Sequence, residues 1–383
     1  MHIVIAPNAF KHSLPATEVA AAIRAGLVTS GINARYTLFP IADGGEGMLE
    51  ILVNYGQGKY KTVTATDPLG RPVSAIFGLI NQGKTAVIEL AQASGIKHLK
   101  TAERDPLRTS TFGTGQVIKA ALDAGATEIL LGVGNSATVD GGMGILQALG
   151  TQFLDEFDEP IGQGAAALAD LVRIDYSGLD ARLAQTKIII ICDVDNPLLG
   201  ERGAARVFGP QKGADAATVV LLEQNLTRFA EVAQKELGLD IRNLSHGGAA
   251  GGTAAGLAAF LRAELVPGVE YILDTTGFAG QLTTADLLIT AEGGLDEQTL
   301  GGKGPYGVAR LAQSQGVPVI CLAGQVPLDL DVKIFRHFNA VFTIATGPTS
   351  LEIALAGTAA NLTRTAGQIG KLLQLNLHEK IKD

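Results

Sequence analysis

The feature that most constrains the fold is the stretch from Glu128 to Gly150, where an apolar run, a small-residue loop and a helical pattern follow one another. The run EILLGVG is rich in branched side chains, which predicts a strand buried within a sheet. Ile145, Leu146 and Leu149 then recur at helical spacing. The sequence here predicts a strand, a loop and a helix, which together form the repeating unit of an α/β sheet.

The loop of this stretch carries three polar side chains, Ser136, Thr138 and Asp140. A small-residue loop before a helix leaves backbone N–H groups free at the helix start, where an anion is favoured. Taken alone, the stretch is explained as simply by a tight connection between a strand and a helix. The anion site is therefore a hypothesis that needs support from the rest of the chain.

The same alternation recurs along the sequence and predicts an α/β protein with a parallel sheet. Further strands are expected near residues 2–6, 36–41, 187–192, 271–273, 286–290, 317–323 and 340–344. Helices are expected at 15–27, 48–53, from 116, at 216–237 and up to about 261. The stretch from 60 to 90 differs, because alternating residues and turn signals predict a β-meander there.

The meander contains a match to the P-loop pattern, Gly78 to Thr85 (GLINQGKT). That pattern cradles phosphate only when a strand precedes it and a helix follows it. Here the apolar run AVIEL follows Thr85, which predicts a hairpin turn between two strands. We therefore expect no phosphate cradle at this motif.

Composition and charge exclude several classes of protein. The net charge is −8 and no basic cluster is present, which argues against nucleic acid or an anionic membrane as partner. No apolar run reaches membrane-spanning length, and the start MHIVIAP does not have the form of a signal peptide. Cys192 and Cys321 end apolar runs and are expected to be buried free thiols. A cytoplasmic protein is the resulting expectation.

Polar side chains follow the predicted strands, at the sheet edge where open α/β folds bind ligands. Lys11 follows the first strand, and Asp43 and Glu46 follow the second. Asp193 and Asp195 follow the isoleucine-rich run that ends at Cys192. Two such carboxylates can hold Mg²⁺ or take a proton, although turn formation alone could also place them there. Later loops add a glycine cluster and five polar residues: Gly251 within Gly247–Gly252, and Glu292, Asp296, Gln298, Thr299 and Lys303.

Eight of these loops, in this order, resemble the glycerate kinase family in its bacterial glyoxylate- and glucarate-pathway type, the glycerate 2-kinases. They are PNAFKHSL at 7–14, ADGGEG at 42–47, TSTFGTG at 109–115, SATVDGG at 136–142, CDVDNPLLG at 192–200, FGPQKGA at 208–214, GGAAGG at 247–252, and EGGLDEQT with GGK at 292–303. The resemblance covers nearly the whole chain. It implies transfer of the γ-phosphoryl group of ATP to D-glycerate with Mg²⁺, and it favours the 2-hydroxyl group.

The resemblance also implies two α/β domains around a cleft, one Rossmann-like and one distinct. Together with the order of the predicted elements, it predicts a discontinuous Rossmann-like domain, residues 1–60 and 270–383, with residues 61–269 as an inserted mixed α/β domain. D-glycerate and ATP are the expected partners. The oligomeric state is left open, with a homodimer as one option.

Phosphoryl transfer needs cations at the phosphates, a metal and a group that takes the hydroxyl proton. Lys11, Lys212 and Lys303 are candidates for the first task, and Asp193 and Asp296 for metal or base. Of these five residues, four are the catalytic candidates: Asp193, Asp296, Lys212 and Lys11. Substrate or phosphate binding is expected from Asp43, Glu46, Ser136, Thr138, Asp140, Gly251, Glu292, Gln298, Thr299 and Lys303.

Four positions depart from the family pattern, and all lie in site loops. Asn8 stands where Asp is usual, Asn135 and Val139 where Gly and Asn are usual, and Gly294 where Arg is usual. The change at Gly294 removes a side chain that grips carboxylate or phosphate through two hydrogen bonds. Two alternatives therefore stay open: a kinase of another small hydroxy acid, and a weakly active ligand-binding relative.

Overall fold

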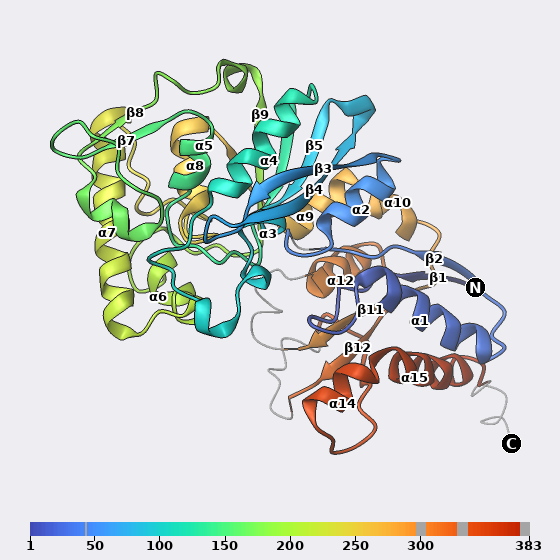
Figure 1. Ribbon diagram of the computed structural model, residues 1–383. Coiled ribbons are helices and arrows are strands. Elements are labelled where there is room, and N and C mark those ends of the chain that lie inside the picture. Colours follow the sequence, from blue (N-terminus) through green and yellow to red (C-terminus); the bar gives the residue numbers. More distant parts are fainter. Residues whose placement is uncertain (43, 296–303, 328–335, 376–383) are drawn as a thin grey trace, which may run out of the picture. The chain divides into compact units, whose positions relative to one another are not determined.

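The computed structural model describes residues 1–42, 44–295, 304–327 and 336–375. Its contacts divide the chain into two compact units (Figure 1). Unit 1 consists of Met1–Asp43 and Val269–Asp383, and unit 2 of Gly44–Gly268. Within the described residues, none of the helices has the length and apolar character needed to span a membrane.

Unit 1 is built on a five-stranded sheet in which every pairing is parallel. In spatial order its strands are β13 (Ala340–Thr343), β12 (Val319–Gln325), β11 (Leu287–Gly294), β1 (His2–Ile5) and β2 (Arg35–Leu38). Because side chains alternate between the two faces of a strand, Ile3 and Ile5 point one way and Val4 points the other. All three are fully buried, so both faces of this sheet are covered.

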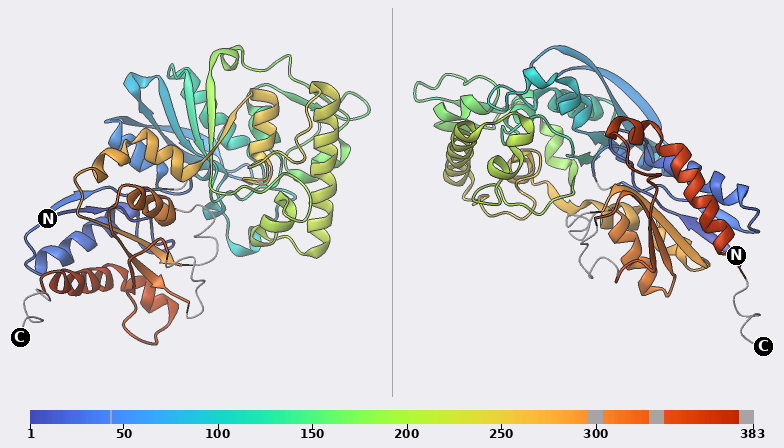
Figure 2. Two further views of the ribbon diagram at one scale, coloured as in Figure 1. Left: turned by 180° about the vertical axis from the view of Figure 1, so that it is seen from behind. Right: turned by 90° about the horizontal axis from the view of Figure 1, so that it is seen from below.

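Helices cover the two faces of the unit 1 sheet separately. The Ile3 and Ile5 face packs against α1 (Ala16–Thr29) and α15 (Thr358–Leu372), which lie side by side in Figures 1 and 2. The Val4 face packs against α9 (Gly268–Thr275), α10 (Phe278–Leu282) and α12 (Gly304–Ser314). A short helix, α14 (Leu351–Ala356), precedes α15. This two-sided arrangement is the expected Rossmann-like layering.

The contact between α1 and α15 depends on Gly26 of α1. A Cβ atom on Gly26 would run into the carbonyl oxygen of Thr363 and lie 2.9 Å from the Ala366 Cβ. A Cβ atom on Gly367, in the facing helix, would lie 3.4 Å from the Gly26 oxygen, which is ordinary contact. The two helices therefore approach closely at Gly26 and not at Gly367.

We expect Gly26→Ala to lower the free energy of unfolding by about 1–3 kcal/mol, because overpacking outweighs the better helix propensity of alanine. Gly367→Ala is the matched control and should be neutral or stabilise by up to about 1 kcal/mol. Urea unfolding of both variants measures the difference. Equal effects of the two substitutions would contradict the close approach of α1 and α15.

Unit 2 is built on a six-stranded mixed sheet. In spatial order its strands are β10 (Glu264–Pro267), β9 (Lys187–Cys192), β6 (Glu128–Gly132), β5 (Thr85–Glu89), β4 (Pro72–Ile80) and β3 (Lys59–Thr66). The first four are parallel, and β4 and β3 continue the sheet antiparallel. This confirms the expected α/β class, with a parallel sheet and a separate mixed sheet, and the β-meander at residues 60–90.

The helices of unit 2 pack on both faces of this sheet, with most of the core on one face. They are α2 (Met48–Tyr55), α3 (Ala91–Ser94), α4 (Phe112–Asp123), α5 (Met143–Ala148), α6 (Ala204–Phe208), α7 (Ala216–Leu237) and α8 (Thr253–Leu261). A two-stranded antiparallel ribbon, β7 (Gln152–Leu154) and β8 (Arg173–Asp175), lies outside the main sheet. The stretch from Glu128 to Gly150 forms β6, a loop and α5, as its pattern predicts.

The P-loop-like motif lies in the antiparallel hairpin of β4 and β5. Its residues Asn81–Gly83 form a single 3-10 turn, and Thr85 begins β5. No helix follows the Gly-Lys pair, so the rejection of this motif as a phosphate cradle holds.

Two expectations differ from the structure. Residues 271–273, expected as a strand, lie inside α9; Val269, Ile272 and Leu273 are buried at helical spacing i, i+3 and i+4. The expected boundary at residue 61 also differs from the contact division at Gly44, because α2 packs on β4 and β5 of unit 2. That the two units are independently folding domains stays a prediction.

Candidate functional site

The carboxyl ends of the parallel strands of unit 2 lie in register and form one polar edge. Glu89 of β5 stands opposite Gly132 of β6, which in turn stands opposite Ile191 of β9. The loops that leave this edge contain most of the predicted site residues of unit 2. A parallel sheet brings such loops together because all its strands end on the same side.

Asp140, in the loop between β6 and α5, is fully buried and is held by four hydrogen bonds. Its Oδ2 accepts from the Thr111 N–H and the Thr111 hydroxyl, both at 2.8 Å, and from the Gly144 N–H at 3.3 Å. Its Oδ1 accepts from the Gly142 N–H at 3.2 Å. All four partners are donors, which suits an ionised carboxylate. Asp140 thus joins the start of α4 to the start of α5.

Lys212 enters the same loop from a tight turn after α6 and is only 3% exposed. Its Nζ donates to the Ser136 hydroxyl and to the Thr138 carbonyl oxygen, both at 2.7 Å. The structure therefore brings three of the predicted site residues together: Lys212, Ser136 and Thr138. In this arrangement the ammonium group holds the loop from within rather than extending into solvent.

Burial shifts the pKa of both charged groups in this network. Removal from water lowers the pKa of Lys212 to about 7, and the nearby Asp140 carboxylate opposes that shift. Removal from water raises the pKa of Asp140, against the lowering effect of its hydrogen bonds to Thr111, Gly144 and Gly142. Strongly shifted titratable groups in a polar cluster are a feature of functional sites.

Gly251 lies against this loop where no other residue fits. A Cβ atom there would collide with the Thr138 carbonyl oxygen, and its φ of +67° lies in the left-handed region. The Gly251 carbonyl oxygen accepts from the Gly141 N–H at 3.0 Å. The Thr138 hydroxyl, although buried, has no hydrogen-bond partner among the described residues. The 247–252 loop therefore packs directly against the 136–142 loop.

Asp193, the candidate for metal or base, directly follows β9 and is exposed. Its neighbour Asp195 is engaged by Arg202 at 2.6 Å. Within the described residues, no group of three or more His, Cys, Asp or Glu side chains could hold a metal ion. Magnesium that accompanies a nucleotide needs only one or two carboxylates, because phosphates and water complete its shell. Asp193 could supply one such carboxylate, and the other predicted metal ligand, Asp296, lies outside the described residues.

Sequence inspection missed Glu89 and Thr111. Thr111 lies within the TSTFGTG loop and bonds Asp140 as described above. Glu89 is buried and accepts from the backbone N–H of Leu49 at 3.0 Å. Its signal was available, because an acid that ends a buried apolar run lies at the ligand-binding edge of the sheet. Glu46, in the loop before α2, is exposed.

Unit 1 has a second group of predicted residues at the carboxyl ends of β1 and β11. Lys11 is exposed in the loop after β1, and Glu292 is buried in β11. The two segments are neighbours, because the Asn8 N–H donates to the Ala291 carbonyl oxygen at 2.8 Å. Five further predicted residues lie outside the described residues: Asp43, Asp296, Gln298, Thr299 and Lys303.

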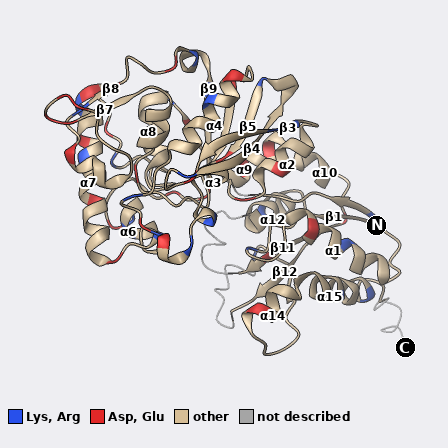
Figure 3. Ribbon diagram, in the orientation of Figure 1, with Lys and Arg blue, Asp and Glu red and all other residues tan. Residues whose placement is uncertain are grey.

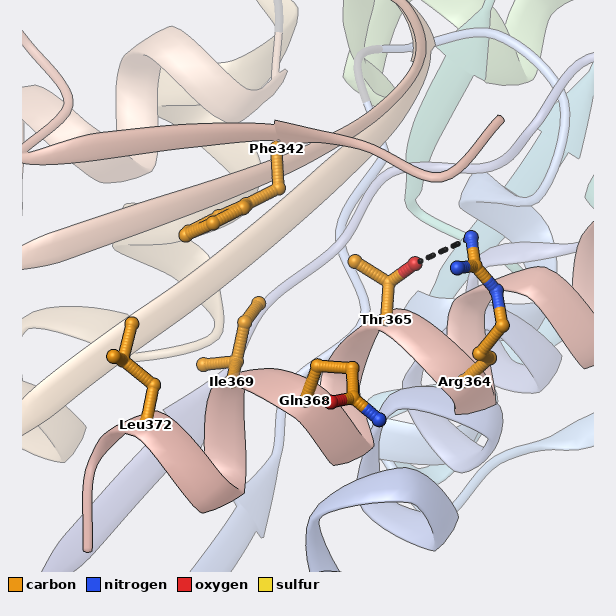
Figure 4. A pocket seen from close by; sticks show the side chains of 6 residues that line it. All are labelled: Phe342, Arg364, Thr365, Gln368, Ile369 and Leu372. Carbon is orange, nitrogen blue, oxygen red and sulfur yellow. Dashed lines mark hydrogen bonds between the residues drawn. The ribbon is translucent and has the colours of Figure 1, made fainter. Parts of the chain in front are cut away.

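A separate hollow of about 350 Å³ in unit 1 contains none of the predicted site residues. In Figure 4, Phe342 of β13 lines one side, and Ile369 and Leu372 of α15 line the other. Arg364 at its rim donates to the Thr365 hydroxyl at 3.5 Å and to the Ile344 carbonyl oxygen at 3.2 Å. Elsewhere, Lys and Arg residues are interspersed with Asp and Glu (Figure 3).

Comparisons with known proteins give one consistent result. The sequence model of the glycerate kinase family matches residues 3–374. The glycerate kinase of Bacillus subtilis (strain 168) is 46% identical, covering 98% of each chain. The glycerate 2-kinase of Escherichia coli (strain K12) is 43% identical over 98% of this chain and 99% of its own. The crystal structure described as a glycerate kinase 2 from Salmonella typhimurium LT2 is 44% identical in sequence over 98% of each chain. Its TM-score to this fold is 0.84.

Proposed function

Because the chain belongs to the glycerate kinase family, we propose that it transfers the γ-phosphoryl group of ATP to D-glycerate, at the 2-hydroxyl group. The observation that carries this proposal is the family match over residues 3–374, with relatives 43–46% identical along their full length. Four of the family's loops, which begin at Pro7, Ala42, Ser136 and Cys192, lie at the carboxyl ends of β1, β2, β6 and β9, where α/β proteins bind ligands.

The buried network of unit 2 supports a phosphate-binding or carboxylate-binding role for the 136–142 loop. Lys212 and Asp140 hold this loop in place, so the Thr138 hydroxyl group, which has no partner among the described residues, keeps one position. Preorganised donors of this kind stabilise developing charge without rearranging during the reaction. An anionic ligand near Lys212 would favour its protonated form, since its pKa lies at about 7.

The remaining roles follow from position. Asp193 is proposed to hold the proton of the attacking hydroxyl group or to ligate Mg²⁺, because it stands exposed at the end of β9. When bound, Mg²⁺ neutralises charge on the phosphate oxygens. Lys11 and Glu292 are proposed as substrate contacts from unit 1. That residues of both units share one substrate cleft stays a prediction, as do the homodimer and the roles of Asp43, Asp296, Gln298, Thr299 and Lys303.

A cytoplasmic location is part of the proposal. Cys192 and Cys321 are both free and buried, and unpaired thiols of this kind are usual in reducing compartments.

A coupled assay with D-glycerate and ATP tests the proposal directly. We expect ADP release that depends on both substrates, and NMR should place the phosphate on C2. A panel of small hydroxy acids tests the first alternative, a kinase of another hydroxy acid. If another acid were phosphorylated far better than D-glycerate, that acid would be the substrate. Thermal stabilisation by glycerate without ADP release would instead indicate a ligand-binding relative.

Gly294 offers a further prediction. It ends β11, and a Cβ atom there would lie 3.7 Å from the Gln325 Cβ, which is ordinary contact. Gly294→Arg should therefore fold normally and lower the KM for D-glycerate by about 3-fold to 10-fold, since one charge-assisted hydrogen bond adds about 1 kcal/mol. Gly294→Met is the uncharged control and should leave the KM unchanged. No gain from the arginine would mean that another residue already replaces it.

A further inference from the structure

Glu89 is a buried carboxylate that none of the roles above uses. It ends β5, is 6% exposed, and lies on the same face of the sheet as α2. Burial raises the pKa of its carboxyl group, while hydrogen bonds from the amides of Leu49 and Gly47 and from the Gln92 side chain oppose the rise. A buried acid is retained at a cost, so its partners indicate what it does.

The main partner of Glu89 is the first turn of α2. This helix has Gly47 at its N-cap and no side-chain cap of its own. The Glu89 Oε1 accepts from the Leu49 N–H at 3.0 Å, and the Gln92 amide holds Oε2 at 3.3 Å. Glu89 therefore supplies from a neighbouring strand the acceptor that a capping Ser, Thr or Asp gives locally.

The segment that α2 anchors, Gly44–Gly47, lies directly on the ends of β6 and β9. The Gly134 N–H donates to the Gly44 carbonyl oxygen at 3.3 Å. A Cβ atom on Gly132 would lie 2.7 Å from that same oxygen, and one on Gly44 would lie 2.7 Å from the Ile191 oxygen. Glycines thus let the loop sit flat on the sheet edge, and Glu89 fixes the end of it that enters α2.

We propose that Glu89 is a positioning residue for substrate binding, which holds the Gly44–Gly47 loop and its exposed Glu46 at the carboxyl edge of the unit 2 sheet. This inference rests on the function proposed above. The acceptor side chain of Glu46 suits the hydroxyl groups of D-glycerate rather than its carboxylate. Loss of the Glu89 bond should therefore weaken glycerate binding and leave nucleotide binding nearly unchanged.

The test compares Glu89→Met with Glu128→Met in the full-length chain, because methionine keeps the length of the side chain and removes both acceptor oxygens. Glu128 is the matched control, because it begins β6 at the opposite edge of the same sheet and accepts one hydrogen bond from Thr85 at 2.8 Å. For Glu89→Met we expect the KM for D-glycerate to rise about 10-fold, which corresponds to about 1.4 kcal/mol. The KM for ATP should change less than about 2-fold, and Glu128→Met should change neither.

Hydrogen exchange gives a readout that separates positioning from a general structural role. In Glu89→Met, the amides of residues 44–49 should exchange at least about 10-fold faster, with the rest of unit 2 unchanged. Gln92→Ala removes the hydrogen bond to only one carboxylate oxygen. It should give the same pattern with a smaller effect, and it replaces Glu89→Met if that variant does not fold. Unchanged exchange at 44–49, faster exchange throughout unit 2, or unchanged KM values would each overturn the role of Glu89. A wild-type protein without D-glycerate turnover would overturn the proposed function instead.

Discussion

Asp140→Ala is expected to lower the free energy of unfolding by about 4 kcal/mol and to remove measurable kinase activity. The substitution leaves four donors without their acceptor in a fully buried site: the N–H groups of Thr111, Gly142 and Gly144, and the Thr111 hydroxyl. Each orphaned buried donor costs about 1–3 kcal/mol, although local relaxation recovers part of the sum. The 136–142 loop and the start of α4 lose their common anchor, so activity should fall with stability.

Urea unfolding together with the coupled assay measures both effects. Asp140→Asn should be intermediate, because it keeps one acceptor oxygen and replaces the other by a donor. Asp170→Ala is the control; Asp170 is exposed in the same unit, and its loss should cost no more than about 0.5 kcal/mol. If Asp140→Ala proved as stable as that control, Asp140 would not carry the buried charge described here.

Lys212→Met is expected to reduce kcat/KM about 100-fold or more, while changing stability in a way that depends on pH. The folded-state pKa of Lys212 is lowered to about 7 from 10.5. Between these values the unfolded chain binds one more proton than the folded chain at this position, so the free energy of unfolding rises with pH. Relative to Lys212→Met, the wild type should gain about 3.5 kcal/mol between pH 7 and pH 10, because the group is already half deprotonated in the folded state at pH 7.

The check is a series of urea unfolding curves at several pH values for the wild type and the variant. Lys119→Met, at an exposed position on α4, serves as control and should track the wild type at every pH. A difference between wild type and Lys212→Met that does not vary with pH would show that the ammonium group is not deprotonated in this range. Loss of the Ser136 and Thr138 contacts should reduce activity at all pH values.

The sequence predicts features that depend on neighbouring residues better than features that depend on residues far apart in the chain. The strand, loop and helix from Glu128 to Gly150 follow from local pattern, and the P-loop match failed on its local context, the strand after Thr85. Residues 271–273 were assigned wrongly because a three-residue apolar run fits either period, and only packing on the sheet decides it.

For the candidate site, the sequence predicts which residues belong to it but not how they contact one another. Ser136, Thr138, Asp140 and Lys212 could be named from their loops, but their burial and mutual contacts could not. The Lys212 ammonium meets a hydroxyl 76 residues earlier in the chain, and Glu89 meets an amide 40 residues earlier. No spacing rule relates such pairs, because the sheet rather than the local chain brings them together.

The pairing of α1 with α15 has a consequence for biosynthesis. Both helices cover the same face of the unit 1 sheet, yet one is made near the start of translation and the other near its end. The apolar side chains of Val19, Ile23 and Leu27 must therefore wait, without their final neighbours, while the ribosome makes all of unit 2. Nascent chains halted before residue 358 should bind chaperones through this first helix, and release of the full-length chain should end that binding.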